Sequence, residues 1–347
     1  MNRKDEHVSL ARAFHQKPKE NDFDAVRMVH SSLVTTRPEE IDLSTEILGL
    51  QLSAPFYINA MTGGSEKTKK INHDLALIAR ETNLMMATGS VSAALKDPNV
   101  ADSYSVVREV NPDGLILGNM GAGRTSEDAK KIVDLLQADG MQIHVNVPQE
   151  LVMPEGDRDF HEWPQNIQQT IQQLDVPVIV KEVGFGMNRE TIQQLQTLGV
   201  KAVDVSGRGG TSFSQIENAR RKKRELSYLD DWGQSTVISL LEAQEFDPLT
   251  ILASGGIRDA YDIFKALCLG AKAVGISATI LDHLISKGID ATIEMIEDWK
   301  AQLQRLYLMT NKKKTVDLIH NPVIIGGAPK EWCQARGIDY KKLAVRS

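Results

Sequence analysis

Short apolar runs rich in β-branched residues alternate along the chain with longer segments whose apolar positions recur every three to four residues. Near-continuous apolar runs are typical of buried parallel strands, and the longer segments are typical of amphipathic helices. Eight runs predict strands, at Pro55–Ala60, Leu84–Thr88, Leu115–Asn119, Met141–Val147, Val176–Val183, Ala202–Ser206, Thr250–Ser254 and Ala273–Ser277. The segments between them predict helices, among them Thr68–Thr82, Ser126–Gln137, Arg189–Leu198 and Asp259–Leu269.

The number and spacing of these runs indicate the fold. Most strand centres lie 23 to 36 residues apart in the numbering, which is the length of a strand-loop-helix-loop unit. Eight such units favour an α/β fold of the (β/α)₈ TIM-barrel class over a doubly wound sheet. We therefore expect a single domain over residues 1–347, with an N-terminal arm at 1–50 and a long closing helix at Ala291–Met309.

One connection is longer than the others. About 48 residues separate the sixth and seventh strand centres, and the excess falls at 207–235, just beyond the carboxyl end of strand six. Barrel enzymes place their active-site loops at that end. The segment holds the basic run Arg220–Arg224. We interpret the run as a solvated helix face, because a nucleic-acid patch would have interleaved aromatic residues.

Polar residues gather where strands four and five end. Side chains of a strand alternate between its two faces, so His144 and Asn146 share the face opposite the aliphatic residues and point into the barrel. Gln149 and Glu150 follow directly. Lys181 ends an apolar run, and a buried ammonium is costly unless an anion pairs with it. A flavin is such a partner, since a cation near the ring stabilises its reduced, anionic form.

Glycines follow strands six, seven and eight. Gly255 and Gly256 end strand seven and precede a helix, Gly275–Ala278 ends strand eight, and Gly209 and Gly210 follow strand six. Loops after strands seven and eight, together with a helix N-terminus, form the usual phosphate pocket of this fold. The chain therefore carries a predicted site for a phosphorylated ligand. No G-x-G-x-x-G motif follows the first strand, which disfavours a Rossmann domain.

The composition excludes several classes of protein. A formal net charge of −6 gives no general attraction to nucleic acid or to anionic membranes. The only two cysteines are far apart, so neither a zinc site nor a disulfide framework is expected. No apolar run approaches the ~20 residues of a membrane span, and the first residues lack the apolar core of a signal peptide. We expect a cytoplasmic protein.

The ordered motifs resemble the type 2 isopentenyl-diphosphate isomerase family across essentially the whole chain. The similarity rests on Arg3-Lys4-x-x-His7, Asn59-Ala60-Met61-Thr62-Gly63-Gly64, Gly89-Ser90, Gly118-Asn119, His144-x-Asn146-x-x-Gln149-Glu150, Lys181-Glu182-Val183-Gly184, Gly207-x-Gly209-Gly210-Thr211 and Ser254-Gly255-Gly256. Some members of that family read Gly-Ser-Gln-Arg after strand two, where this chain reads Gly89-Ser90-Val91-Ser92. A substrate contact at Val91 or Ser92 is therefore not carried over.

The resemblance implies interconversion of isopentenyl and dimethylallyl diphosphate with reduced FMN, NADPH as the reductant and Mg²⁺, in a homotetramer or larger assembly. It assigns flavin contacts to Ala60, Met61, Thr62, Ser90, Asn119, Lys181, Ser206, Thr211, Gly255, Gly256, Ser277 and Ala278. It assigns substrate contacts to Arg3, Lys4, His7, His144, Asn146 and Gln149, and metal binding to Glu150. Gln149, His144 and Lys181 are the expected catalytic side chains.

Two other functions remain open at this point. One is an FMN-dependent barrel oxidoreductase of the 2-hydroxy-acid oxidase or dihydroorotate dehydrogenase kind, which needs a base against a C–H bond and consumes electrons in step with product. The other is a non-catalytic flavin sensor or nucleic-acid binder. Such a protein has no need of Gln149 and Glu150 at the barrel mouth.

Overall fold

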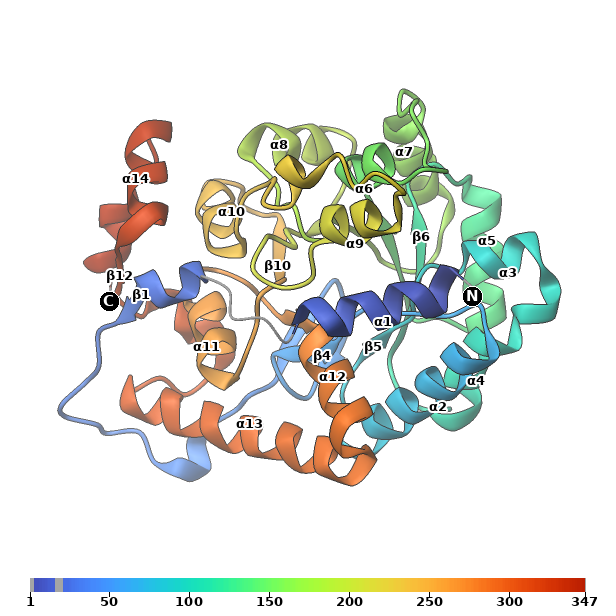
Figure 1. Cartoon of the computed structure of the whole chain (residues 1–347). Helices are drawn as coiled ribbons and strands as arrows, with labels where there is room; N and C mark the ends of the chain where they lie inside the picture. Colours follow the sequence, from blue (N-terminus) through green and yellow to red (C-terminus); the bar gives the residue numbers. More distant parts are fainter. Residues whose placement is uncertain (1–2, 16–20, 347) are drawn as a thin grey trace.

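The computed structural model describes residues 3–15 and 21–346, without the side chains of Arg3, Lys4 and His15. Its centre is a closed barrel of eight parallel strands in chain order (Figure 1). The eight predicted strands are confirmed, and most are shorter than predicted. They are β4 (Phe56–Ile58), β5 (Met86–Ala87), β6 (Ile116–Gly121), β7 (Gly140–His144), β8 (Val178–Lys181), β9 (Ala202–Asp204), β10 (Thr250–Ser254) and β11 (Val274–Ile276).

Helices surround the barrel, and each predicted helix is confirmed to within two residues at either end. The surrounding helices are α2 (Glu66–Glu81), α4 (Asp102–Val110), α5 (Ser126–Leu136), α7 (Trp163–Gln173), α8 (Arg189–Thr197), α10 (Thr236–Glu242), α11 (Ala260–Cys268) and α13 (Ile289–Met309). Side-chain caps define where several begin: Ser65 Oγ accepts from the Thr68 N–H at 3.2 Å, and Asp259 Oδ1 accepts from Tyr261 and Asp262. No helix in the described ranges is long and apolar enough to cross a bilayer.

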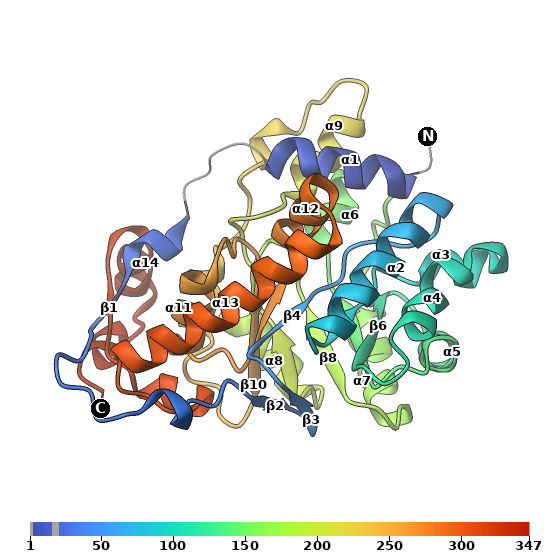
Figure 2. The same cartoon turned by 90° about the horizontal axis from the view of Figure 1, so that it is seen from below.

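A hairpin closes the amino-terminal end of the barrel. Strands β2 (Thr45–Ile47) and β3 (Leu50–Leu52) pair antiparallel around Leu48 and Gly49, both of which have positive φ, as a two-residue type I′ turn requires. Ile47 and Leu52 are buried against the apolar side chains inside the barrel. The segment expected only as an arm therefore also forms the floor of the barrel, opposite the end where α1 lies (Figure 2).

Helix α1 (Arg3–His15) lies across the other end, near α12 (Ala278–Lys287) and α9 (Phe213–Arg220) (Figures 1 and 2). Three of its side chains attach it to different elements. Ser65 Oγ donates to Asp5 at 2.7 Å, Arg12 Nε donates to Asp282 at 3.2 Å, and Arg220 Nε donates to Glu6 at 3.3 Å. The carboxyl end of the barrel is thus covered by the start of the chain.

The C-terminal segment packs beside the barrel. Strand β12 (Val323–Ile325) pairs with β1 (Val26–Met28), and α14 (Gly327–Arg336) follows it. The remaining short helices, α3 (Ser92–Lys96) and α6 (Val147–Val152), follow β5 and β7 at the carboxyl end of the barrel.

Candidate active site

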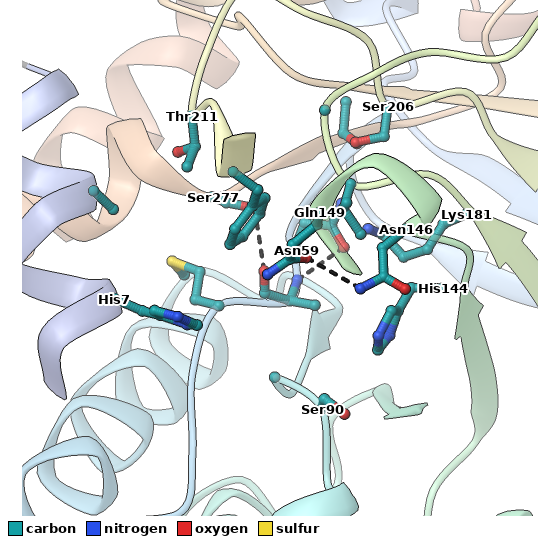
Figure 3. A pocket seen from close by; sticks show the side chains of 18 of the residues that line it. His7, Asn59, Ser90, His144, Asn146, Gln149, Lys181, Ser206, Thr211 and Ser277 are labelled. Atoms are coloured by element: carbon teal, nitrogen blue, oxygen red, sulfur yellow. Dashed lines mark hydrogen bonds between the residues drawn. The ribbon is translucent and has the colours of Figure 1, made fainter. Parts of the chain in front are cut away.

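A cavity of about 640 Å³ opens at the carboxyl ends of the strands, beneath α1 (Figure 3). This volume is in the range of cofactor and substrate sites. The structure brings together there the predicted site residues with described side chains, which are His7, Ala60, Met61, Thr62, Ser90, Asn119, His144, Asn146, Gln149, Glu150, Lys181, Ser206, Thr211, Gly255, Gly256, Ser277 and Ala278. The side chains of Arg3 and Lys4 lie outside the described residues. Ser92 lines the cavity and Val91 does not.

The glycine loops approach one another too closely for side chains. Gly255 and Gly256 have φ of 90° and 74°, and a Cβ on Gly255 would lie 2.1 Å from the Gly207 carbonyl oxygen. Asn21 Nδ2 donates to the Gly256 carbonyl at 2.6 Å, which ties the loop to the N-terminal segment. Helix α12 begins at the same wall with Ala278. A helix N-terminus beside tight glycine loops is suited to a phosphate group.

Lys181 ends β8 at the bottom of this cavity. Its side chain is almost fully buried, and Nζ donates to the main-chain carbonyl of Glu182 at 2.6 Å. Burial lowers the pKa of the Lys181 ammonium, and the carboxylates of Asp204 and Glu182 oppose that shift. Burial also raises the pKa of Glu182 to about 7, although three backbone N–H groups donate to its Oε2. Lys181 also lines the cavity, so an anion bound there could pair with the ammonium.

Polar side chains at the end of β7 form the opposite wall. The His144 Nδ1 atom lies 2.7 Å from Asn119 Oδ1. Asn146 Nδ2 donates to Gln149 Oε1 at 3.2 Å and to Glu150 Oε1 at 2.9 Å. The other oxygen of Glu150 accepts from the Asp157 N–H. Among the described residues no three His, Cys, Asp or Glu side chains converge to hold a metal ion.

The sequence analysis missed Glu217, which lies behind this wall on α9 with no exposed side-chain surface. Gln149 Nε2 and Arg220 Nη1 donate to it at 3.0 and 2.5 Å, and His7 Nε2 lies 3.1 Å away. Burial alone would raise the pKa of Glu217, but His7, Gln149 and Arg220 together lower it to about 2. A fixed negative charge therefore holds the Gln149 amide by a hydrogen bond and lies close to the His7 ring, and both side chains line the cavity.

The basic run is solvated only in part: Lys222, Lys223 and Arg224 are exposed, as expected, but Arg220 is not. Its guanidinium is 12% exposed and pairs with Glu6, Glu155 and Glu217, so it does not belong to a solvated helix face. Helix α9 ends at Arg220, and Arg221 pairs with Glu225 beyond it. The first two arginines of the run thus contact carboxylates of the protein itself.

The residues present fit a bound FMN. The glycine loops and the start of α12 would suit its phosphate, and the Lys181 side chain in the cavity wall could offer a cation to its ring. Thr62 Oγ1 is buried at the cavity wall and has no hydrogen-bond partner within the described chain. Buried polar atoms are rarely left unpaired, so this hydroxyl has the character of a ligand contact.

Comparison with known proteins also indicates an FMN-dependent enzyme. An FMN-dependent dehydrogenase family model matches residues 124–320, more than half of the chain. An isopentenyl-diphosphate delta-isomerase of Latilactobacillus sakei is 53% identical over 93% of this chain and 93% of its own length. The chain belongs to the isopentenyl-diphosphate delta-isomerase family. A second member of that name, from Staphylococcus haemolyticus, is 47% identical over 97% of both chains.

The barrel of this chain is also similar to that of flavocytochrome b2. A flavocytochrome b2 variant superposes with a TM-score of 0.66 at 18% identity, covering 90% of this chain and 81% of the other. At that identity the likeness concerns the fold. The family is therefore decided by the isomerase relatives, which favour isomerisation over the oxidoreductase alternative.

Proposed function

We propose that this enzyme interconverts isopentenyl and dimethylallyl diphosphate by adding a proton at one carbon and removing one from another. The observation that supports this most strongly is the 53% identity to a named isomerase over nearly the full length of both chains. Reduced FMN, when bound, supplies an electron-rich ring that stabilises positive charge and exchanges a proton. NADPH is the proposed reductant that prepares the flavin.

The chain's own residues bind, orient and exclude water. The loops at Gly255 and Gly256 hold the flavin phosphate, and Lys181 keeps a positive charge beside the ring. Helix α1 covers the cavity, and excluding water protects a cationic substrate species from being quenched. Gln149 presents an amide whose two ends are both fixed, by Asn146 and by Glu217. We assign Gln149 to positioning or relaying a proton, since a neutral amide is a weak acid and a weaker base.

The diphosphate is proposed to lie between α1 and the end of β7. Arg3 and Lys4 begin α1, His7 is one turn further on, and His144, Asn146 and Gln149 face it from the other side (Figure 3). Mg²⁺ commonly takes one or two carboxylates together with substrate phosphate oxygens and water. Glu150 is the carboxylate that we propose as the Mg²⁺ ligand beside the diphosphate.

The function is tested by following electrons and protons separately. We expect photoreduced enzyme to turn over many times without NADPH, air-oxidised enzyme to be inactive, and solvent deuterium to enter the product. Oxidation of one NADPH for each product molecule would instead establish an oxidoreductase.

Glu150→Gln is expected to raise the Mg²⁺ concentration needed for half-maximal activity about tenfold or more, because a neutral amide is a poor ligand for a hard cation. Flavin content should stay unchanged, since Glu150 is remote from the glycine loops. A Mg²⁺ titration monitored by product formation measures the effect. Asp159→Asn is the matched control, because it removes a carboxylate that is 74% exposed in the loop that follows α6. Equal Mg²⁺ requirements in the two variants would contradict the assignment of Glu150.

We also propose a homotetramer or larger assembly. Large apolar side chains are exposed in one region, where the segment after β1 meets the end of α13 and the strand β12, namely Val29, Leu33, Val34, Met309, Val316, Ile319 and Ile324. Contiguous exposed apolar surface is typical of a contact between proteins. Light scattering on the purified protein gives the number of copies.

A further inference from the structure

Asp204, on β9, is a carboxylate inside the barrel for which the proposed reaction has no direct use. Its side chain is completely buried below the cavity. Ser254 Oγ donates to its two oxygens at 2.9 and 2.8 Å, Asn59 Nδ2 donates at 3.1 Å, and the Ser206 N–H donates at 3.1 Å. The carboxylate is thus surrounded by donors, as a buried anion must be.

A line of hydrogen bonds runs from this carboxylate across the barrel to His144. Asn59 Nδ2 donates to Asp204, and Gln142 Nε2 donates to Asn59 Oδ1 at 3.0 Å. Asn119 Nδ2 donates to Gln142 Oε1 at 3.3 Å, and His144 Nδ1 lies 2.7 Å from Asn119 Oδ1. Figure 3 shows Asn59 and His144, the two members of the line that it labels, at the wall of the cavity.

The direction of this line is fixed at its start. A carboxylate only accepts hydrogen bonds, so the group that faces Asp204 must be the NH₂ of Asn59. The main-chain N–H of Ala60, which only donates, points at the carbonyl of the same side chain at 2.8 Å. Two groups with a single possible role therefore orient Asn59 in the same way.

The orientation of Asn59 determines how the amide groups of Gln142 and Asn119 are oriented. Because Asn59 offers Gln142 an oxygen, Gln142 must present its nitrogen there and its oxygen to Asn119. Asn119 must then present its nitrogen to Gln142 and its oxygen to His144. An oxygen that already faces the ring nitrogen at 2.7 Å can only accept, so Nδ1 must carry the proton.

We propose that Asp204 is a positioning residue that holds the neutral His144 ring in the Nδ1–H tautomer through Asn59, Gln142 and Asn119. The ring then carries a lone pair at Nε2, so that nitrogen accepts and does not donate unless the ring takes up a second proton. One consequence rests on the proposed function: His144 can donate through Nε2 to a diphosphate oxygen only as an imidazolium. The tautomer itself does not depend on which substrate is bound.

The tautomer is measured by magic-angle-spinning NMR on FMN-loaded enzyme labelled with ¹⁵N at its eight histidines. The sample is held near pH 8.5, about two units above the usual histidine pKa of ~6.5, where an imidazole with that usual pKa is neutral. His144→Gln identifies the His144 signals by their loss. We expect a protonated Nδ1 and an unprotonated Nε2. A proton on Nε2 in the unsubstituted enzyme would overturn the proposal.

Asp204→Asn tests the origin of the effect, because it places an NH₂ group at the end of the line where only an acceptor stood. Only the Ala60 N–H then still favours the original orientation of Asn59, so we expect a detectable, partial Nε2–H population of His144 in this variant. Ser254→Ala is the matched control: it removes a donor to Asp204 and keeps the carboxylate, so the Nδ1–H tautomer should persist. A pure Nδ1–H signal in Asp204→Asn, or a shift in Ser254→Ala as large as in Asp204→Asn, would refute the role of the carboxylate.

If Asp204→Asn does not fold, Gln142→Met replaces it, since it interrupts the line midway and leaves Asn119 free to turn. The expected result is again an Nε2–H population, and its absence would count against the proposal. An enzyme that shows Nδ1–H but does not isomerise the diphosphate would overturn the proposed function and leave this inference standing.

Discussion

Lys181→Ala should abolish turnover and weaken FMN binding, with a loss in kcat of about a thousandfold or more, equivalent to ~4 kcal/mol. The Lys181 ammonium is buried at the end of β8 between the carboxylates of Glu182 and Asp204. Without it, a reduced flavin ring and two buried acidic groups would share one region with no cation. Flavin content after desalting and the isomerisation rate measure the two effects.

Lys265→Met supplies a matched control for that experiment. Lys265 is equally buried, and its Nζ also donates to a main-chain carbonyl, that of Phe23 at 2.7 Å. It lies on α11, away from the cavity, so this variant should lose stability and keep its flavin and its rate. A Lys181→Ala enzyme with full flavin content and a near-normal rate would remove Lys181 from the site.

Glu242→Ala is expected to destabilise the fold by about 1.5–3 kcal/mol, because it leaves the half-buried guanidinium groups of Arg189 and Arg336 without their carboxylate. The Glu242 side chain has no exposed surface and accepts from Arg189 at 2.9 Å, from Trp332 at 2.7 Å and from Arg336 at 2.9 Å. It thereby joins α8, α10 and α14. For a chain of this size the loss corresponds to a Tm lowered by roughly 2–4 °C, measured by calorimetry.

The pH dependence of the stability lost in Glu242→Ala tests whether the ionised carboxylate is responsible for it. Burial would raise the pKa of Glu242, but Arg336, Trp332 and Arg189 together lower it to about 2, from 4.5 in the unfolded chain. A lowered folded-state pKa means that the stabilisation is present above pH 4.5 and is lost as the pH falls toward 2. The difference in the free energy of unfolding between wild type and Glu242→Ala should therefore become smaller as the pH falls from 4.5 toward 2. Glu190→Ala is the control, since the Glu190 carboxylate pairs with Arg336 while half exposed and should contribute much less to stability than Glu242 does.

Much of the barrel could be predicted from the sequence because its signals are local. Each strand is a short apolar run, and helices such as α2 and α11 begin at side chains that cap their own first turn. The hairpin β2–β3 was missed because it has only three residues in each strand, too few to show alternation. Its role as the barrel floor follows from tertiary packing of Ile47 and Leu52.

The same distinction separates the site residues that were predicted from those that were missed. His144 and Lys181 stand at the ends of apolar strands, where a polar side chain is conspicuous. Glu217 and Arg220 stand in a polar segment, and only their neighbours from α1 and α6 bury them. Such burial depends on contacts between distant parts of the chain, which periodicity does not report.

Asp204 had a signal that was available in the sequence. It is the only charged residue within the predicted strand Ala202–Ser206, and alternation places it on the same face as Ala202 and Ser206. A carboxylate facing the interior of a barrel requires donors, and polar residues on the neighbouring strands could supply them. Identifying Asn59 and Ser254 as those donors needed the three-dimensional pairing of the strands.

The hairpin floor also constrains the kinetics of the enzyme. A barrel sealed at one end by Ile47 and Leu52 admits ligands only from the end that α1 covers. Of the two ligands, the one that lies deeper in the cavity must bind first and dissociate last. With the flavin seated beside Lys181 and the diphosphate between it and α1, substrate would block flavin exchange, so the two ligands would bind in a compulsory order and saturating substrate would slow the loss of cofactor on dilution.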